Sequence, residues 1–219
     1  MEYKAYDKGG GRILKVRRSL PSRAVQTILY SVRCRNISMW PLILRNHFPA
    51  TNGLPALATP LSAMPPETRK LFGNIEIVRD CDYTQDKVTP LRDFNATHSL
   101  EENIAVMDRY VGMIQQLWSL GIGDPYYNFQ WNAGVYEDGT VAQLDVADLV
   151  TNVAVLGEHT KQKVWLVTAL PGIEDQALRS ECARILNNGL TYEAFLERWP
   201  AIPVFPEISH ATSWRRGPA

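Results

Sequence analysis

The polar residues that could do chemistry lie in the middle of this 219-residue chain, between residues 123 and 145. Residues 123–132, Gly-Asp-Pro-Tyr-Tyr-Asn-Phe-Gln-Trp-Asn, are unusually rich in polar and aromatic groups and contain Asp124, Asn128 and Asn132. Asp145 follows thirteen residues after Asn132. The chemistry that can be argued from this sequence lies in this stretch.

A long helix is expected just before this polar loop. Ser99 is a good N-cap, and Glu102 completes a capping box three residues later. Gly121 suits the left-handed residue that ends a helix, and Pro125 is poorly placed inside one, so the helix should give way to the loop. Apolar residues recur between these ends at steps of three and four, which predicts one buried face. They are Ile104, Met107, Tyr110, Val111, Ile114, Leu117 and Trp118.

A β-hairpin is expected after the loop. Asp138-Gly139 is a strong two-residue hairpin signal between residues 133–136 and 140–144. Asp145 comes directly after the second strand. The hairpin therefore carries an acidic residue at its exit.

This order of helix, loop with Asp and Asn, hairpin and Asp resembles the catalytic half of the protein-kinase-like superfamily. In that family a loop Asp handles the acceptor hydroxyl, an Asn five positions later holds a metal ion, and the Asp of an Asp-Phe-Gly motif holds magnesium against the phosphates. Asp145-Val-Ala-Asp148 is similar to the last motif, without its Phe and Gly. The resemblance implies ATP and magnesium as cofactors and Asp145 as a metal ligand.

The resemblance leaves two assignments of the loop open. Asn132 lies at nearly the family's spacing before Asp145, but the residue five before it is Tyr127, which cannot do an Asp's work. If Asp124 is the loop Asp, Asn128 follows it by four residues rather than five. The resemblance therefore implies Asp124 as the catalytic residue and Asn128 or Asn132 as the cofactor-binding Asn, with Asn132 also a metal ligand.

A second hairpin is expected at the start of the chain. Residues 2–7 and 12–17 flank Gly9-Gly10-Gly11, which reads as a turn with positive φ rather than a phosphate-binding loop. Lys15 lies in the second strand and resembles the family's strand Lys, which pairs the nucleotide phosphates. The alternative is a solvated edge lysine. The resemblance includes neither the family's first strand nor its glycine-rich phosphate lid.

The segment after this hairpin departs most from the family. Residues 21–35 are expected to form a helix in the place of the family's regulatory helix, but they contain no acidic residue that could pair with Lys15. Glu67 and Glu76 would be unorthodox substitutes. Residues 39–48 are expected to form a second short helix.

Two further strands and a polar break are expected before the long helix. Residues 56–61 and 74–78 read as strands, and residues 80–87, Asp-Cys-Asp-Tyr-Thr-Gln-Asp-Lys, as a polar break. This break resembles the hinge between the lobes of the family, so the domain boundary is placed around residue 84.

The last third of the chain is expected to be mainly helical. Residues 149–156 and 164–170 are apolar runs, and periodicity does not decide whether the second is a strand or a buried helix. Residues 173–188 read as a helix stopped by Gly189, and Thr191 as the cap of a last short helix.

Charge is unevenly distributed although the net charge is zero. Residues 1–66 hold ten Lys and Arg against two acidic residues, a balance of +8, and the rest of the chain carries −8. Either an anionic ligand or partner binds near the first third, or the two parts pair with each other. Nucleic acid is an unlikely partner, because no aromatic stacking platform accompanies the arginines beyond Tyr30. The clustered arginines are Arg17, Arg18, Arg23, Arg33 and Arg35.

Composition favours a cytoplasmic protein. No run of about 18 apolar residues could span a bilayer, and the first residues lack the apolar core of a signal peptide. Cysteines and histidines form no metal-binding spacing, so the histidines are expected at the surface. These residues are Cys34, Cys81, Cys182, His47, His98, His159 and His210.

Together these patterns predict an α+β, two-lobed kinase-like fold, with a small antiparallel sheet in residues 1–84 and a mainly helical lobe in residues 85–219. The implied function is an atypical phosphotransferase that uses Mg-ATP on an unknown protein or small-molecule acceptor. The alternative is a pseudokinase or binding module that engages a protein or an anionic partner through its basic first lobe. No membrane partner is expected.

Overall fold

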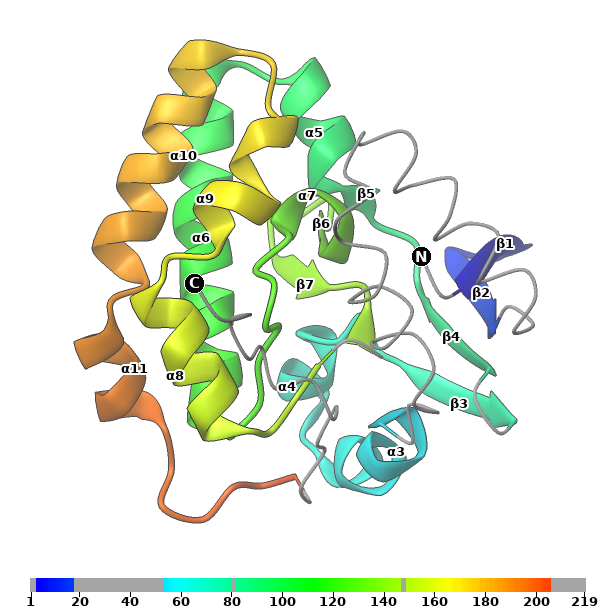
Figure 1. Cartoon of the computed structure of the whole chain (residues 1–219). Helices are drawn as coiled ribbons and strands as arrows, with labels where there is room; N and C mark the ends of the chain where they lie inside the picture. The colour runs from blue at the N-terminus through cyan, green and yellow to red at the C-terminus, as the bar shows by residue number, and fades with distance from the viewer. Residues whose placement is uncertain (1–2, 18–52, 80–81, 147–148, 206–219) are drawn as a thin grey trace, which may run out of the picture.

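Two small antiparallel sheets and a group of helices make up the α+β fold of the computed structural model, which describes residues 3–17, 53–79, 82–146 and 149–205. One sheet lies on one side of the molecule, the longer helices lie on the other, and the second sheet lies between them (Figure 1). Among the described helices, none is long and apolar enough to cross a membrane.

The first sheet has the strand order β1-β2-β4-β3 and is antiparallel throughout. Its strands are β1 (Tyr3–Gly9), β2 (Arg12–Arg17), β3 (Glu76–Arg79) and β4 (Asp82–Asp86). Gly9, Gly10 and Gly11 all have positive φ, so the predicted glycine turn between β1 and β2 is confirmed. Lys15 pairs with Tyr83 across β2 and β4.

The second sheet consists of β5 (Thr89–Pro90), β6 (Ala133–Val135) and β7 (Val141–Gln143). Gly139 has φ 79°, and Asp138 Oδ1 accepts a hydrogen bond from Thr140 N at 2.9 Å. The predicted Asp-Gly hairpin is therefore confirmed, and Asp145 lies two residues beyond the end of β7.

The long helix α6 (Leu100–Ser119) begins where the capping box predicts. Ser99 N donates to Glu102 Oε2 at 2.8 Å, and Glu102 N donates to Ser99 Oγ at 3.3 Å. Gly121 follows the helix with φ 77°. The predicted apolar face is buried apart from Ile104, which is partly buried and packs against the core.

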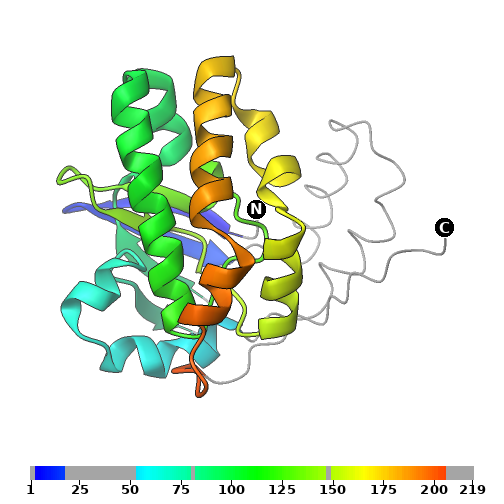
Figure 2. The same cartoon turned by 90° about the vertical axis from the view of Figure 1, so that its left-hand side faces the viewer.

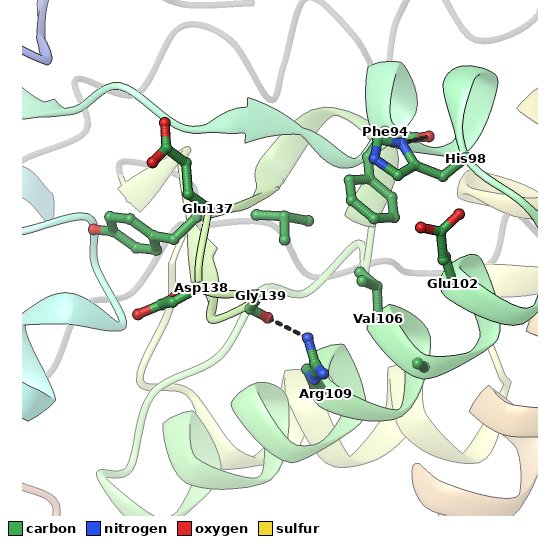
Figure 3. A pocket seen from close by; sticks show the side chains of 11 residues that line it. Phe94, His98, Glu102, Val106, Arg109, Glu137, Asp138 and Gly139 are labelled. Atoms are coloured by element: carbon green, nitrogen blue, oxygen red, sulfur yellow. Dashed lines mark hydrogen bonds between the residues drawn. The ribbon is translucent and has the colours of Figure 1, made fainter.

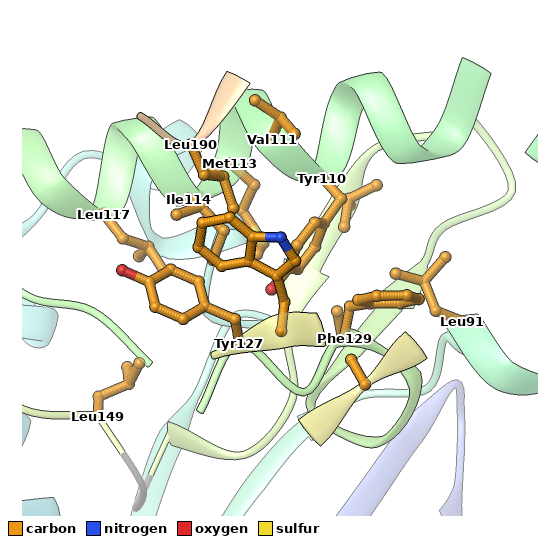
Figure 4. Packing of buried hydrophobic residues seen from close by; sticks show 14 of the residues in the cluster. Leu91, Tyr110, Val111, Met113, Ile114, Leu117, Tyr127, Phe129, Leu149 and Leu190 are labelled. Atoms are coloured by element: carbon orange, nitrogen blue, oxygen red, sulfur yellow. The ribbon is translucent and has the colours of Figure 1, made fainter. Parts of the chain in front are cut away.

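Helix α6 packs against α10 and α11, and α10 lies beside it (Figure 2). Aromatic residues of the polar loop pack under α6 (Figure 4): the rings of Tyr127 and Phe129 lie 6.4 Å from Trp118 and 5.5 Å from Tyr110, respectively. The bounds are α3 (Gly53–Ala63), α4 (Pro66–Lys70), α5 (Leu91–Thr97), α7 (Phe129–Asn132), α8 (Val153–Lys161), α9 (Trp165–Thr168), η3 (Leu170–Gly172), α10 (Gln176–Gly189) and α11 (Tyr192–Arg198).

The prediction of a strand over residues 56–61 is wrong, because this segment belongs to helix α3. Leu57, Leu61 and Met64 are buried, and their spacing of four and three residues is helical. A short apolar run has too little periodicity to separate a strand from a helix. The run over residues 164–170, left open by the sequence, is helical as α9 and η3.

The prediction of a polar break over residues 80–87 is also wrong for its described part, because residues 82–86 form strand β4. Thr84 and Gln85 are buried there, and both have hydrogen-bond partners: Arg12 Nη2 donates to Thr84 Oγ1 at 2.8 Å, and Gln85 Nε2 donates to the Phe72 carbonyl at 3.0 Å. Hydrogen bonds of this kind offset the free-energy cost of burying polar side chains in a sheet. Other predictions are confirmed with shifted bounds: the strand expected over residues 74–78 is β3, and the helix expected over residues 173–188 is α10, which begins at Gln176 and includes Gly189. Thr191 caps α11 as predicted.

Some predictions lie outside the described residues. These are the two helices over residues 21–35 and 39–48, most of the arginine cluster, Cys34, Cys81, His47, His210 and Asp148.

Candidate functional site

Asp124 lies in the turn between α6 and α7, and backbone hydrogen bonds hold the residue before it. Gly123 and Val150 exchange two backbone hydrogen bonds, at 3.0 and 2.9 Å. The Asp124 carboxylate is only 1% exposed; its Oδ1 accepts from Tyr126 N at 2.8 Å and its Oδ2 from Asn132 Nδ2 at 2.9 Å. The carboxylate is therefore fixed in orientation by donors on both oxygens.

Of the two candidate asparagines, Asn132 is the one whose side chain reaches Asp124. Asn128 instead precedes the short helix α7, whose first turn is closed by the 2.9 Å bond from Asn132 N to the Asn128 carbonyl. Its side chain does not cap α7, and its Oδ1 is buried without a hydrogen-bond partner.

Asp145 is brought to the same place by the β6–β7 hairpin. Leu144 N donates to the Asn132 carbonyl at 2.6 Å, so the residue before Asp145 is bonded directly to the candidate asparagine. Asp145 Oδ1 is buried and has no hydrogen-bond partner within the described structure. A buried carboxylate oxygen without a donor is costly, which makes this atom a candidate ligand for a cation.

Burial, a neighbouring charge and hydrogen bonds all act on the Asp124 carboxyl. Burial raises the pKa of Asp124 and the charge of Asp145 raises it further, while hydrogen bonds from Asn132, Tyr126 and Gln143 act in the opposite direction. The hydroxyl of Tyr110 on α6 is buried without a partner, and burial, with the charge of Asp124, raises its pKa.

Lys15 approaches this group from the first sheet. Its Nζ donates to the carbonyl of Leu144, the residue before Asp145, and lies 5.5 Å from the ring of Tyr83. Half-burial and this contact with the hairpin exclude the alternative of a solvated edge lysine. Strand β2 thus carries a positive charge to the hairpin exit.

Two of these residues carry oxygens of the kind that magnesium prefers. Magnesium prefers oxygen ligands and commonly uses one or two carboxylates, with waters and substrate phosphates completing its shell. Asp145 offers an unpartnered carboxylate oxygen, and Asn132 still has its amide oxygen because its nitrogen donates to Asp124. Within the part of the chain that the structure describes, no three His, Cys, Asp or Glu side chains group together as a metal site, so protein ligands would be few.

Two residues of the site region were missed or misjudged from the sequence. His159 was expected at the surface, and this is wrong: it is 6% exposed, and its Nδ1 lies 2.6 Å from the Pro125 carbonyl. Its position three residues after the buried Leu156 on α8 was the available signal. Gln143 is fully buried and was missed, because a lone glutamine in a strand carries no spacing signal.

A separate pocket of about 340 Å³ lies between α5, α6 and the β6–β7 turn (Figure 3). Arg109 Nη1 donates to the Gly139 carbonyl at 3.1 Å along one wall. None of the predicted site residues lines this pocket. Its lining consists of Phe94, His98, Glu102, Ala105, Val106, Arg109, Val135, Tyr136, Glu137, Asp138 and Gly139.

Comparison with known proteins assigns no family to this chain. A scan against models of protein families found no match, and neither did a search of curated proteins. Function must therefore be argued from the residues themselves.

Proposed function

We propose that the chain is an atypical kinase-like phosphotransferase that transfers phosphate from Mg-ATP to a protein or small-molecule acceptor. The observation that carries this proposal is the hydrogen bond from Asn132 Nδ2 to the Asp124 carboxylate. Leu144, the residue before Asp145, bonds to the backbone carbonyl of the same Asn132 at 2.6 Å. Lys15 joins the same group through the Leu144 carbonyl. An acid, an amide, a second acid and a lysine are the set that phosphoryl transfer uses.

Each residue has a distinct role in this proposal. Asp145 and the amide oxygen of Asn132 would hold magnesium, which supplies positive charge against the phosphates. Lys15 would neutralise phosphate charge, and Asn128 is the weaker cofactor-binding candidate. Asp124 would accept the proton of the acceptor hydroxyl while the oxygen of that hydroxyl bonds to the γ-phosphorus and ADP leaves. The raised pKa of Asp124 suits a proton acceptor.

The proposed architecture has two lobes, as in the kinase-like superfamily. Strand β4 continues to Asp86, so the boundary predicted at residue 84 moves to the segment between β4 and β5. The first lobe then contains the four-stranded sheet, and the second contains the hairpin and the helices that hold Asp124 and Asp145.

A second candidate function is a pseudokinase or binding module, and one observation favours it. Asp124 is almost fully buried and both of its oxygens already accept hydrogen bonds, which leaves an acceptor hydroxyl little access. In addition, Glu76 lies 3.3 Å from Arg12, so this substitute for the family's acidic partner of Lys15 is engaged elsewhere. Such a module would engage a protein or anionic partner through its basic first third.

Replacing Asp124 by alanine tests the catalytic proposal. Turnover should fall by about 10²- to 10⁴-fold, the range of a lost general base, while the affinity for Mg-ATP changes little. Phosphate transfer to candidate acceptors or to water, measured beside calorimetric titration of Mg-ATP, separates the two quantities. Equal turnover in Asp124→Ala and the parent would remove Asp124 from the chemistry, and a parent that binds Mg-ATP without turnover would favour the pseudokinase.

A further inference from the structure

Side chains of α8 and α9 bond to consecutive residues of the loop that follows Asp124. His159 Nδ1, near the end of α8, lies 2.6 Å from the Pro125 carbonyl, and Thr168 Oγ1, at the end of α9, donates to the Tyr126 carbonyl at 2.6 Å. A carbonyl oxygen can only accept a hydrogen bond, so Nδ1 of His159 carries the proton. The loop is therefore bonded to these two helices directly after the proposed catalytic carboxylate.

The next loop residue, Tyr127, has an unusual backbone conformation. Its φ is 50°, a left-handed value that residues other than glycine rarely adopt, and its side chain is fully buried. The Thr160 hydroxyl donates to the Leu156 carbonyl at 2.8 Å, so at 2.6 Å the Tyr127 hydroxyl is the donor to Thr160. A strained conformation of this kind persists only where the surrounding structure fixes it. The path of the loop therefore depends on α8.

One peptide unit of this loop joins His159 to Asp124. The carbonyl of Pro125 and the N–H of Tyr126 belong to the same peptide, which is trans and planar, so the two groups point in opposite directions. The carbonyl accepts from His159, and the N–H donates to Asp124 Oδ1 at 2.8 Å. A donor on the carbonyl also polarises the peptide and strengthens the bond that its N–H makes.

We propose that His159 is a positioning residue that orients the Pro125–Tyr126 peptide so that its N–H bonds to the Asp124 carboxylate. Without this donor the buried Pro125 carbonyl loses its fixed partner, and the peptide can rotate away from Asp124. The effect on catalysis rests on the proposed function, whereas the orientation of the peptide does not.

Amide hydrogen exchange at Tyr126, followed by NMR, tests the orientation without any activity. His159→Leu removes the donor and should speed this exchange by about tenfold or more. His159→Asn removes the ring but keeps an N–H donor near the place of Nδ1, and should stay within about threefold of the parent. Unchanged exchange in His159→Leu, or equal acceleration in His159→Asn, overturns the inference.

Asn103→Leu is the matched control for a lost buried hydrogen bond. Asn103 on α6 is 2% exposed, and its Nδ2 donates to the His98 carbonyl at 3.1 Å. This variant should leave the exchange of the Tyr126 amide within about threefold of the parent, because its lost bond lies elsewhere. Acceleration equal to that of His159→Leu would show only a general loss of stability and overturns the inference.

Activity tests the catalytic consequence in the same variants. In His159→Leu, kcat should fall by about tenfold or more while KM for Mg-ATP changes by less than about threefold, because Asp124 acts mainly in the transition state. His159→Asn should recover most of the lost kcat, and an unchanged kcat in folded His159→Leu overturns the consequence for catalysis. A parent without turnover rejects the proposed function, while the exchange measurements still decide the role of His159. If His159→Leu does not fold, His159→Gln replaces it, because its longer side chain moves the donor away from the Nδ1 position.

Discussion

At the scale of residues, hydrogen-bond donors decide what the buried acids can do. Asp124 and Asp145 could be selected from the sequence, because one lies in a polar loop and the other follows a hairpin. The sequence could not choose between Asn128 and Asn132, since the choice depends on the path of the loop. The helical turn α7 settles that path and brings Asn132 to within 2.9 Å of Asp124. Gln143 could not be singled out, because a lone glutamine in a strand carries no spacing signal.

The two asparagines provide a prediction with its own control. Asn132→Ala should weaken Mg-ATP binding by about tenfold or more, because it removes a proposed metal ligand and a donor to Asp124. Asn128→Ala should bind Mg-ATP nearly as the parent does. Calorimetric titration of both variants measures this difference, and the reverse order of effects would assign the loop Asn to Asn128.

At the scale of elements, strong local signals predicted structure well and short apolar runs did not. The capping box, the Asp-Gly turn and the glycine turn each depend on neighbouring residues alone, and all three are confirmed. Residues 56–61 and 82–86 were misassigned because their state depends on distant partners. Strand β4 shows this plainly: Asp86 accepts from Arg12 Nη1 at 2.7 Å, Asn74 Nδ2 at 2.6 Å and Tyr136 Oη at 2.8 Å, and so connects the first sheet to the hairpin.

This connection predicts a pH-dependent stability. Burial raises the pKa of Asp86, but hydrogen bonds from Asn74, Tyr136 and Arg12 outweigh it and hold the pKa below its usual 3.8. The ionised form therefore stabilises the fold above about pH 4, and this stability is lost as the pH falls through the lowered pKa. Asp86→Asn should cost about 2 kcal/mol at pH 7, and the difference from the parent should shrink in acid.

Denaturant unfolding of the parent and Asp86→Asn between pH 7 and pH 2 measures this effect. Asp93→Asn is the control, because Asp93 is exposed and lies 3.7 Å from Arg92 in a surface pair. A difference between the parent and Asp86→Asn that does not change with pH would show that the Asp86 charge does not stabilise the fold.

At the scale of the whole molecule, the basic first third and the acidic remainder could be recognised from sequence, but not their purpose. Arg12 pairs with both Asp86 and Glu76, which supports internal pairing for this one residue. Most of the arginine cluster lies outside the described residues, so the anionic-partner interpretation stays a prediction. The proposed binding of Mg-ATP depends instead on the contact between the two sheets, where Lys15 of the first sheet bonds to the Leu144 carbonyl just after the hairpin of the second.

Calorimetric titration of ATP into the full chain, with and without magnesium, tests that claim most directly. The parent should bind one ATP with saturation in the presence of magnesium and far more weakly without it. Asp145→Asn should lose the magnesium dependence while remaining folded by circular dichroism, because an amide of equal size lacks the anionic charge that magnesium prefers. Absence of ATP binding by the folded parent, with or without magnesium, or identical Mg-ATP binding by Asp145→Asn, would contradict the account.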